Sequence, residues 1–138
     1  MPLTADQDIA NLLRTAKTIA MVGASDRPDR PSHGVMRFLL SRGYDVIPVN
    51  PQLAGQRIHD RPVLASLDEI RAPIDIVDIF RNSTAAGPVI DAAIDAGAKA
   101  VWTQLGVFND EAVARAEAAG LKAVVNRCPA IEIPRLGL

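Results

Sequence analysis

The chain has 138 residues, which is the length of one domain with a core large enough to fold unaided. Its 15 basic and 16 acidic residues nearly cancel, which argues against nucleic acid or an anionic membrane surface as a partner. No apolar run reaches the roughly 18 residues of a membrane span, and residues 1–6 do not resemble a signal peptide. A single cysteine, Cys128, excludes an intramolecular disulfide. We therefore expect one cytoplasmic domain over residues 1–138.

Strand-like and helix-like patterns alternate along the chain. Apolar runs of strand length predict strands at residues 18–22, 44–49, 74–80, 100–105 and 122–126. Helical spacing predicts an opening helix that ends near Ala16 and later helices that end on Gly43, Gly97 and Gly120. Such βαβ repetition is typical of a parallel sheet with helices on both faces. The expected fold class is α/β: a Rossmann-like, doubly wound parallel sheet in a single three-layer domain.

Local features of the first half carry expectations of their own. Thr4 and Ser66 each begin a capping-box pattern, and Ser32 is a good N-cap for the second helix. A short edge strand is predicted at residues 62–64. Pro48 lies inside a predicted strand, where it removes a ladder donor, so we expect a bulge or a bend there.

The second half adds further expectations. Asp75 and Asp78 alternate with apolar residues, which predicts that one edge or one end of the third strand meets solvent. The helix after it starts at residues 83–84, or with Pro88 in its first position, and Asn109 caps the next helix. Residues 130–138 are apolar for a terminus, so they are expected to dock on the body or on a second subunit, and a homodimer is favoured.

Ligands of doubly wound sheets bind outside the carboxyl ends of the strands. The first strand runs into Gly23, and a polar loop leads from it to a helical run at residues 35–42. A glycine turn and a helix N-terminus together favour a phosphate group. The pattern fails as a dinucleotide fingerprint, because Ser25 stands where G-x-G-x-x-G needs its second glycine. In addition, Asn50 replaces the carboxylate that would hold a ribose.

Taken together, the strand ends resemble the small bacterial and archaeal CoA-binding proteins of the YccU type. These proteins are similar to the CoA-binding domain of the succinyl-CoA synthetase α subunit. The segments that carry the resemblance are residues 22–25, 30–32, 48–51, 78–82, 102–106 and 126–129, in that order. The resemblance covers the chain from about residue 12 onward, and it implies a Rossmann-like fold that holds coenzyme A (CoA) across the strand ends.

The resemblance also implies a role for each matching segment. The pyrophosphate would meet backbone N–H groups and a hydroxyl at Gly23, Ala24 and Ser25. The start of the next helix would close over it with Arg30, Pro31 and Ser32. The adenosine side would be lined by Asn50 and Pro51. The pantetheine arm would be flanked by Phe80, Arg81, Asn82, Thr103, Gln104, Leu105 and Gly106.

Arginine suits a phosphate ligand because it can donate two parallel hydrogen bonds. The region after the first strand holds Arg27, Arg30, Arg37 and Arg42. Arg81 is either a ligand-binding cation or a surface residue paired with Asp78 or Asp75. The family often has a cation where this chain has Gln52, and Arg57 is the nearest substitute that could hold the 3′-phosphate.

No catalytic set is recognisable, because the chain has no nucleophile elbow, no Walker lysine and no Cys–His–acid grouping. Its two histidines have no companions at metal-ligand spacing, so no metal is expected. Cys128 either forms a mixed disulfide with the CoA thiol, with Arg127 favouring the thiolate, or is a small buried cysteine.

The expected function is therefore binding of CoA or acyl-CoA without catalysis. The alternatives are a small NAD(P)-dependent oxidoreductase, a nucleotide-sugar enzyme, or a regulatory module that senses acyl-CoA.

Overall fold

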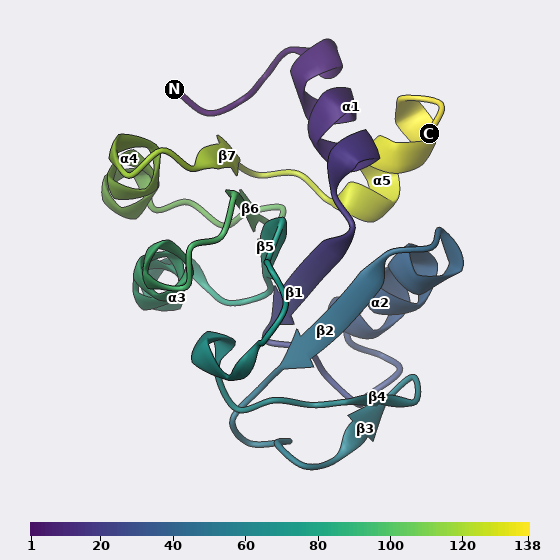
Figure 1. Cartoon of the computed structure of the whole chain (residues 1–138). Helices are drawn as coiled ribbons and strands as arrows, with labels where there is room; N and C mark the ends of the chain where they lie inside the picture. Colours follow the sequence, from purple (N-terminus) through teal and green to yellow (C-terminus); the bar gives the residue numbers. More distant parts are fainter.

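The computed structural model describes residues 1–138, arranged around a five-stranded parallel sheet (Figure 1). Its strands are β1 (Thr18–Val22), β2 (Asp45–Val49), β5 (Ile76–Ile79), β6 (Ala100–Thr103) and β7 (Lys122–Val124). Across the sheet they are ordered β2-β1-β5-β6-β7. Since the chain leaves β1 first toward one edge and later toward the other, the switch point lies between β1 and β5.

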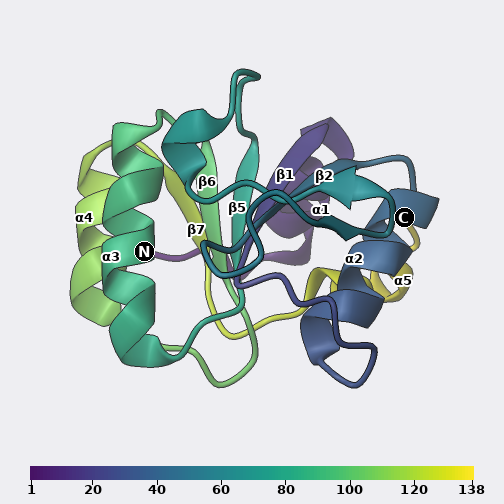
Figure 2. The same ribbon diagram turned by 90° about the horizontal axis from the view of Figure 1, so that it is seen from below.

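Helices cover both faces of the sheet. The helices α1 (Asp6–Thr15), α2 (Pro31–Ser41) and α5 (Pro129–Arg135) lie on one face, and α3 (Ser83–Asp95) and α4 (Asp110–Ala118) lie on the other (Figure 2). Successive strand residues serve the two cores in turn, so Met21 packs with the first group and Val22 with the second. This arrangement confirms the predicted three-layer, doubly wound fold.

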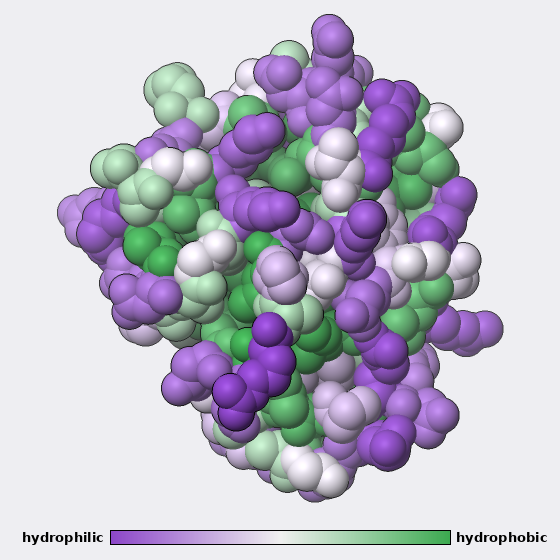
Figure 3. Space-filling model, in the orientation of Figure 1, coloured by the Kyte–Doolittle hydropathy of each residue, from purple (hydrophilic) through white to green (hydrophobic).

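The outer surface is mixed in character. Polar side chains cover much of the face seen in Figure 3, with apolar side chains showing between them. No helix combines the length and the apolar character that crossing a membrane requires.

The chain between β2 and β5 adds small elements at the sheet edge. The strands β3 (Arg57–Ile58) and β4 (Arg61–Pro62) form an antiparallel hairpin, and Leu64 makes a single bridge to Val49. Of the edge strand expected at residues 62–64, Pro62 belongs to β4 and Leu64 forms this bridge. The segment after Ser66 forms only a 3₁₀ turn, η1 (Leu67–Glu69).

The bulge expected at Pro48 is absent, because β2 is an edge strand. The β1–β2 register runs unbroken through the pair Met21–Pro48. The carbonyl of Pro48 accepts a hydrogen bond from Leu64 N (3.0 Å), so this residue faces away from β1. At that position the missing N–H of proline costs no ladder hydrogen bond.

Two of the expected helix caps are wrong, and two starts are correct. The N-cap of α1 is Ala5 rather than Thr4, and the N-cap of α2 is Arg30 rather than Ser32. Pro31 occupies the first position of α2, where its fixed φ suits a helix and its missing N–H is not needed. The side chains of Asn82 and Asn109 cap α3 and α4, so α3 starts at the earlier of the two expected positions.

The apolar C-terminal segment folds as α5 against its own chain, next to α2, which is one of the two expected outcomes. Ile133 lies in the core that α1 and α2 share. Glu132 is also buried, and its carboxylate accepts hydrogen bonds from Arg127 Nη1 and Arg135 Nη2, each at 2.8 Å. Burial raises the pKa of Glu132, but the two guanidinium groups outweigh it and leave this pKa below its usual range.

We predict that Glu132→Gln lowers the free energy of unfolding by about 1–3 kcal/mol, because it leaves two guanidinium groups without their carboxylate. Urea denaturation at neutral pH measures the change. The control is Glu111→Gln on the exposed side of α4, expected to stay within about 0.5 kcal/mol of the wild type. Equal effects of the two substitutions would contradict this role for Glu132.

Candidate functional site

The turn after β1 depends on a glycine. Gly23 has φ +87°, and a Cβ atom built on it would lie 2.3 Å from the carbonyl oxygen of Phe80. Gly23 N donates to Val49 O (2.9 Å), and Phe80 N donates to Val22 O (2.8 Å). The turn therefore joins the ends of β2, β1 and β5 at the switch point, where the fold class places its ligands.

The loop from Gly23 to α2 is held by its own side chains. Ser25 N donates to Ser32 Oγ (3.1 Å), and Arg27 N donates to Ser25 Oγ (3.1 Å). Asn50 links this loop to the one after β2, because its Nδ2 donates to Ala24 O (2.9 Å). The N–H groups of Gly23 and Ser25, two of those expected to meet the pyrophosphate, are thus already occupied within the protein. The hydroxyl proton of Ser25 is free for a ligand.

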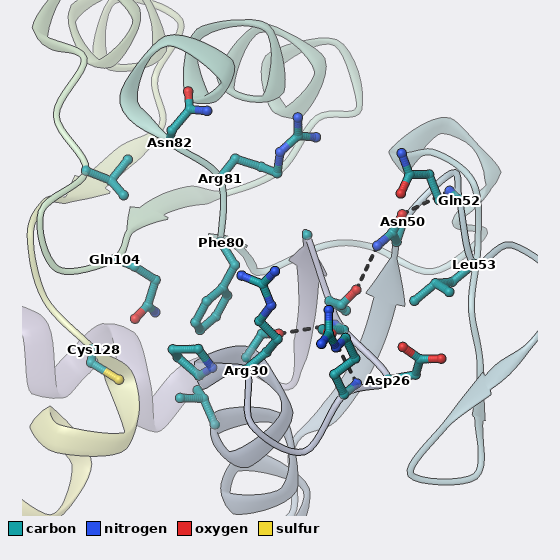
Figure 4. A pocket seen from close by; sticks show the side chains of 18 of the residues that line it. Asp26, Arg30, Asn50, Gln52, Leu53, Phe80, Arg81, Asn82, Gln104 and Cys128 are labelled. Carbon is teal, nitrogen blue, oxygen red and sulfur yellow. Dashed lines mark hydrogen bonds between the residues drawn. The ribbon is translucent and has the colours of Figure 1, made fainter.

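The carboxyl ends of the strands open into a cleft of about 760 Å³, a size typical of small-molecule sites. Most of the site residues expected from the sequence line it together (Figure 4). They are Gly23, Ala24, Ser25, Arg30, Pro31, Ser32, Asn50, Phe80, Arg81, Asn82, Gln104, Leu105 and Cys128.

Three expected residues do not line the cleft. Pro51 is exposed in the turn after β2. Thr103 is buried, donating to Val107 O (2.9 Å) and accepting from Asn126 N (3.1 Å). Gly106 N donates to the side chain of Asn126 (2.7 Å). Thr103 and Gly106 therefore shape the loop that carries Gln104.

Four lining residues had no role assigned from the sequence: Asp26, Val35, Leu53 and Val107. Gln52, which stands where the family often has a cation, also lines the cleft. All lie within a few residues of an expected position. The sequence does not give the path of each loop, and this path decides which side chains face the cleft.

Only some of the arginines expected near a phosphate lie at the cleft. Arg27, Arg30 and Arg81 line the cleft, whereas Arg37 and Arg42 do not. Arg81 pairs with neither Asp75 nor Asp78. Asp75 accepts hydrogen bonds from Lys17 N and Thr18 N and pairs with Lys99, and Asp78 is bonded to Gln104 alone. Of the two alternatives for Arg81, the surface pairing is wrong.

Arg57 does not take the place of the missing cation at Gln52. Its Nη1 donates to Asp60 O (2.8 Å), and it lies outside the cleft lining.

The middle of the cleft is suited to an anion. The first turn of α2 has no side-chain cap. Pro31 has no N–H group and His33 N donates to Arg30 O (3.1 Å), so the Ser32 N–H is the group left beside Arg30 for a ligand. At α3, by contrast, Asn82 Oδ1 already accepts from Ala85 N (2.8 Å). Figure 4 shows Arg30 and Phe80 near the middle, with Gln104 and Cys128 on one side and Asn50 and Leu53 on the other.

Asp78 in β5 was expected at a solvated edge or end, but it is fully buried. The reason is that β5 is a central strand, covered on both faces. Asp78 Oδ1 accepts from Gln104 Nε2 (2.7 Å), and Oδ2 is buried without any hydrogen-bond partner. Burial raises the pKa of Asp78 to about 7, against a smaller opposing effect of the Gln104 hydrogen bond.

Cys128 lines the cleft but is 7% exposed. Arg127 pairs with Glu132 at 2.8 Å rather than with the thiol, so the expectation that it favours the thiolate is wrong. Burial raises the pKa of the Cys128 thiol, with backbone hydrogen bonds opposing it and the nearby charge of Asp78 adding to it.

Comparison with known proteins points to one family. A family model described as a CoA binding domain matches residues 17–134. The Bacillus subtilis (strain 168) protein YneT is 37% identical over 121 residues, which make up 88% of each chain. A solved structure from Pyrococcus horikoshii OT3 superposes with a TM-score of 0.93 at 39% identity, covering 100% of this chain and 97% of that one.

A larger protein also matches. The dinucleotide-forming acetyl-coenzyme A synthetase 1 of Ca. Korarchaeum cryptofilum aligns with 81% of this chain and 27% of its own, with a TM-score of 0.68 at 25% identity. The chain belongs to the CoA-binding domain family, which confirms the resemblance seen in the strand ends.

We predict that Gly23→Ala lowers the free energy of unfolding by more than about 2 kcal/mol, because a Cβ meets backbone and the positive φ is strained. The matched control is Gly34→Ala within α2, where a Cβ meets nothing within 4 Å. Alanine is the better helix former, so the control is expected to gain about 0.5–1 kcal/mol. Urea denaturation measures both, and an unaffected Gly23→Ala protein would contradict the account of the turn.

The buried Asp78 predicts a pH dependence of stability. Its folded pKa lies above its unfolded value of 3.8, so the folded state binds the extra proton between these values. Stability is then lost as the pH rises toward 7. We predict that the free energy of unfolding of Asp78→Asn, relative to that of the wild type, is higher at about pH 8 than at about pH 5. The expected increase is on the order of a few kcal/mol.

Urea denaturation at both pH values measures this gain. The control, Asp8→Asn, removes an exposed carboxylate from α1 and is expected to show no comparable gain. A constant difference between Asp78→Asn and the wild type at the two pH values would refute the raised pKa.

Proposed function

We propose that the cleft binds CoA or an acyl-CoA, with the pyrophosphate at the Gly23 turn and the N-terminus of α2. The observation that carries the proposal is the convergence of three features on one cleft: a backbone turn without a side chain, an uncapped helix start and arginine side chains. Each feature favours an anion, and together they suit a ligand with several phosphate charges.

The two sides of this anion site suggest how the rest of the ligand lies. Phe80, Val107 and Cys128 give one side apolar walls, with the amide of Gln104 among them. A thin pantetheine arm, with its two amide groups, fits such a groove. The adenosine then lies on the side of Asn50 and Leu53.

We further propose that binding proceeds without catalysis by this chain. The cleft brings together no nucleophile–base pair, and Cys128 has a raised rather than a lowered pKa. A reaction on the bound CoA would then need a separate enzyme.

A regulatory module and a homodimer, the two roles that an exposed apolar tail would favour, lose support. The tail was the feature that favoured a regulatory module or a homodimer, and as α5 it is packed on its own body. A homodimer remains a proposal that rests on the exposed side chains of Leu105, Phe108 and Ile131.

Calorimetric titration tests the proposed ligand. We predict that CoA binds and that NAD⁺ and NADP⁺ give no binding heat. Weaker binding of 3′-dephospho-CoA in the same series would show that the 3′-phosphate is read despite Gln52. The dinucleotides are expected to fail because Asn50 is occupied by Ala24 O and Gln52 N and offers no ribose-binding carboxylate. Binding of NAD⁺ or NADP⁺ in place of CoA would favour the oxidoreductase alternative.

Arg30 is the cation whose removal is most informative. We predict that Arg30→Ala weakens CoA binding about tenfold or more, as expected for the loss of charge-assisted hydrogen bonds to phosphate. Arg14→Ala on the exposed side of α1 makes the same change in net charge and is expected to bind as the wild type does. Equal weakening in both variants would show a general charge effect rather than a phosphate site.

The mixed disulfide at Cys128 is also proposed. The Cys128 thiolate attacks the disulfide of oxidised CoA, forms a protein–CoA disulfide and releases one CoA thiolate. Because the pKa is raised, we predict slow addition of one CoA that speeds up with pH, seen in the intact mass. Cys128→Ser is expected to add none, and folded wild type that gains no mass would end the idea.

A further inference from the structure

Asp78 occupies an unusual place for a carboxyl group. It lies in the central strand β5 and pairs in register with Met21 of β1 and Trp102 of β6. It follows Ile76 by two positions, so its side chain lies on the face covered by α1, α2 and α5. Both carboxyl oxygens are enclosed, yet the structure supplies a hydrogen-bond partner to Oδ1 alone.

Few charged groups lie near this carboxyl. The side chains that α1 buries are apolar, and α2 buries Met36 and Leu39 together with the uncharged hydroxyl of Ser32. On the α5 side the titratable groups are Cys128 and Glu132, and Glu132 is already paired with Arg127 and Arg135. No cation therefore compensates the ionised form of Asp78, and its protonation is set by burial.

The only side chain bonded to Asp78 is that of Gln104, which lines the cleft. An amide has a donor end and an acceptor end. Ionised Asp78 accepts only, so it holds Gln104 Nε2 and leaves Gln104 Oε1 as the group available to a ligand. Protonated Asp78 can instead donate to Oε1, which allows the amide to turn over and present its N–H₂ group.

Gln104 lies on the same side of the cleft as Cys128 (Figure 4). This is the side to which the proposed function assigns the pantetheine arm, whose far end carries the thiol or thioester. A free thiol is a weak donor and tolerates the Gln104 oxygen. A thioester has no such proton, and its carbonyl oxygen meets another acceptor.

We propose that Asp78 is a positioning residue that acts through Gln104 to make this end of the cleft prefer free CoA over a thioester, and that protonation of Asp78 relaxes the preference. The inference rests on the proposed function and adds to it a choice between CoA and acyl-CoA. It explains why a carboxyl group with only one hydrogen-bonded oxygen is buried at this position, which packing alone does not explain.

The test measures the dissociation constants of CoA and acetyl-CoA by calorimetry at about pH 6 and about pH 8. With a pKa of about 7, the neutral fraction of Asp78 falls from about 90% to about 10%, so the ratio of the acetyl-CoA constant to the CoA constant is expected to rise about tenfold. Both ligands carry the same phosphates, so the ionisation of these groups cancels in the ratio. The CoA thiol remains mostly protonated at the higher pH.

The matched variant is Asp78→Asn, which offers Gln104 either a donor or an acceptor at every pH. For this variant, the ratio of the acetyl-CoA constant to the CoA constant is expected to be the same at both pH values. It should be close to the ratio that the wild type shows at about pH 6. Asp8→Asn, remote on α1, is expected to keep the tenfold change.

Two failures can be told apart. Binding of both ligands with a wild-type ratio that does not change with pH, or a change that persists in Asp78→Asn, would overturn this inference alone. If neither ligand binds at either pH, the proposed function fails and this inference falls with it.

Discussion

The close approach of Gly23 to the carbonyl of Phe80 is the constraint from which the site follows. It allows β1 to end in a turn pressed against the end of β5, while the Gly23 N–H still reaches Val49 O of β2. The chain then has room to pass over the strand ends before it enters α2. A side chain at this point would separate the turn from β5 and fill the place where a ligand's phosphate approaches the backbone.

The loops around this turn are fixed to one another before any ligand arrives. Asn50 bridges the loops after β1 and β2, and Ser32 reaches back from α2 to the Ser25 N–H. Thr103 and Asn126 do the same for the loop that carries Gln104. Binding therefore has little backbone to order, which lowers its entropic cost. It also means that several polar residues at the strand ends serve the fold rather than the ligand.

The β–α alternation follows from local patterns, because glycines and asparagines mark where helices stop and start. Most lining residues were expected from the family resemblance of the strand ends. Contacts distant in sequence decide the rest. Pro48 is harmless only because β2 lies at the edge, and Asp78 is buried only because β5 lies in the centre. Neither follows from strand-length patterns, which do not give strand order. The helix α5 was not predicted, because Pro129 and Pro134 within seven residues argue against a helix. Burial of Ile133 in the core stabilises the helix despite these prolines.

The most direct test of the account is the amide NMR spectrum of isotope-labelled protein titrated with CoA. We predict that the largest shifts fall at Gly23, Ala24 and Ser32, with smaller ones at Phe80 and Gln104, around a single cleft. A second, smaller cavity of about 460 Å³ lies away from these residues and is lined by Lys99 and Lys122 among others. Shifts centred on Lys99 and Lys122, with Gly23 and Ser32 unchanged, would contradict the central claim that the Gly23 turn and the start of α2 hold the pyrophosphate.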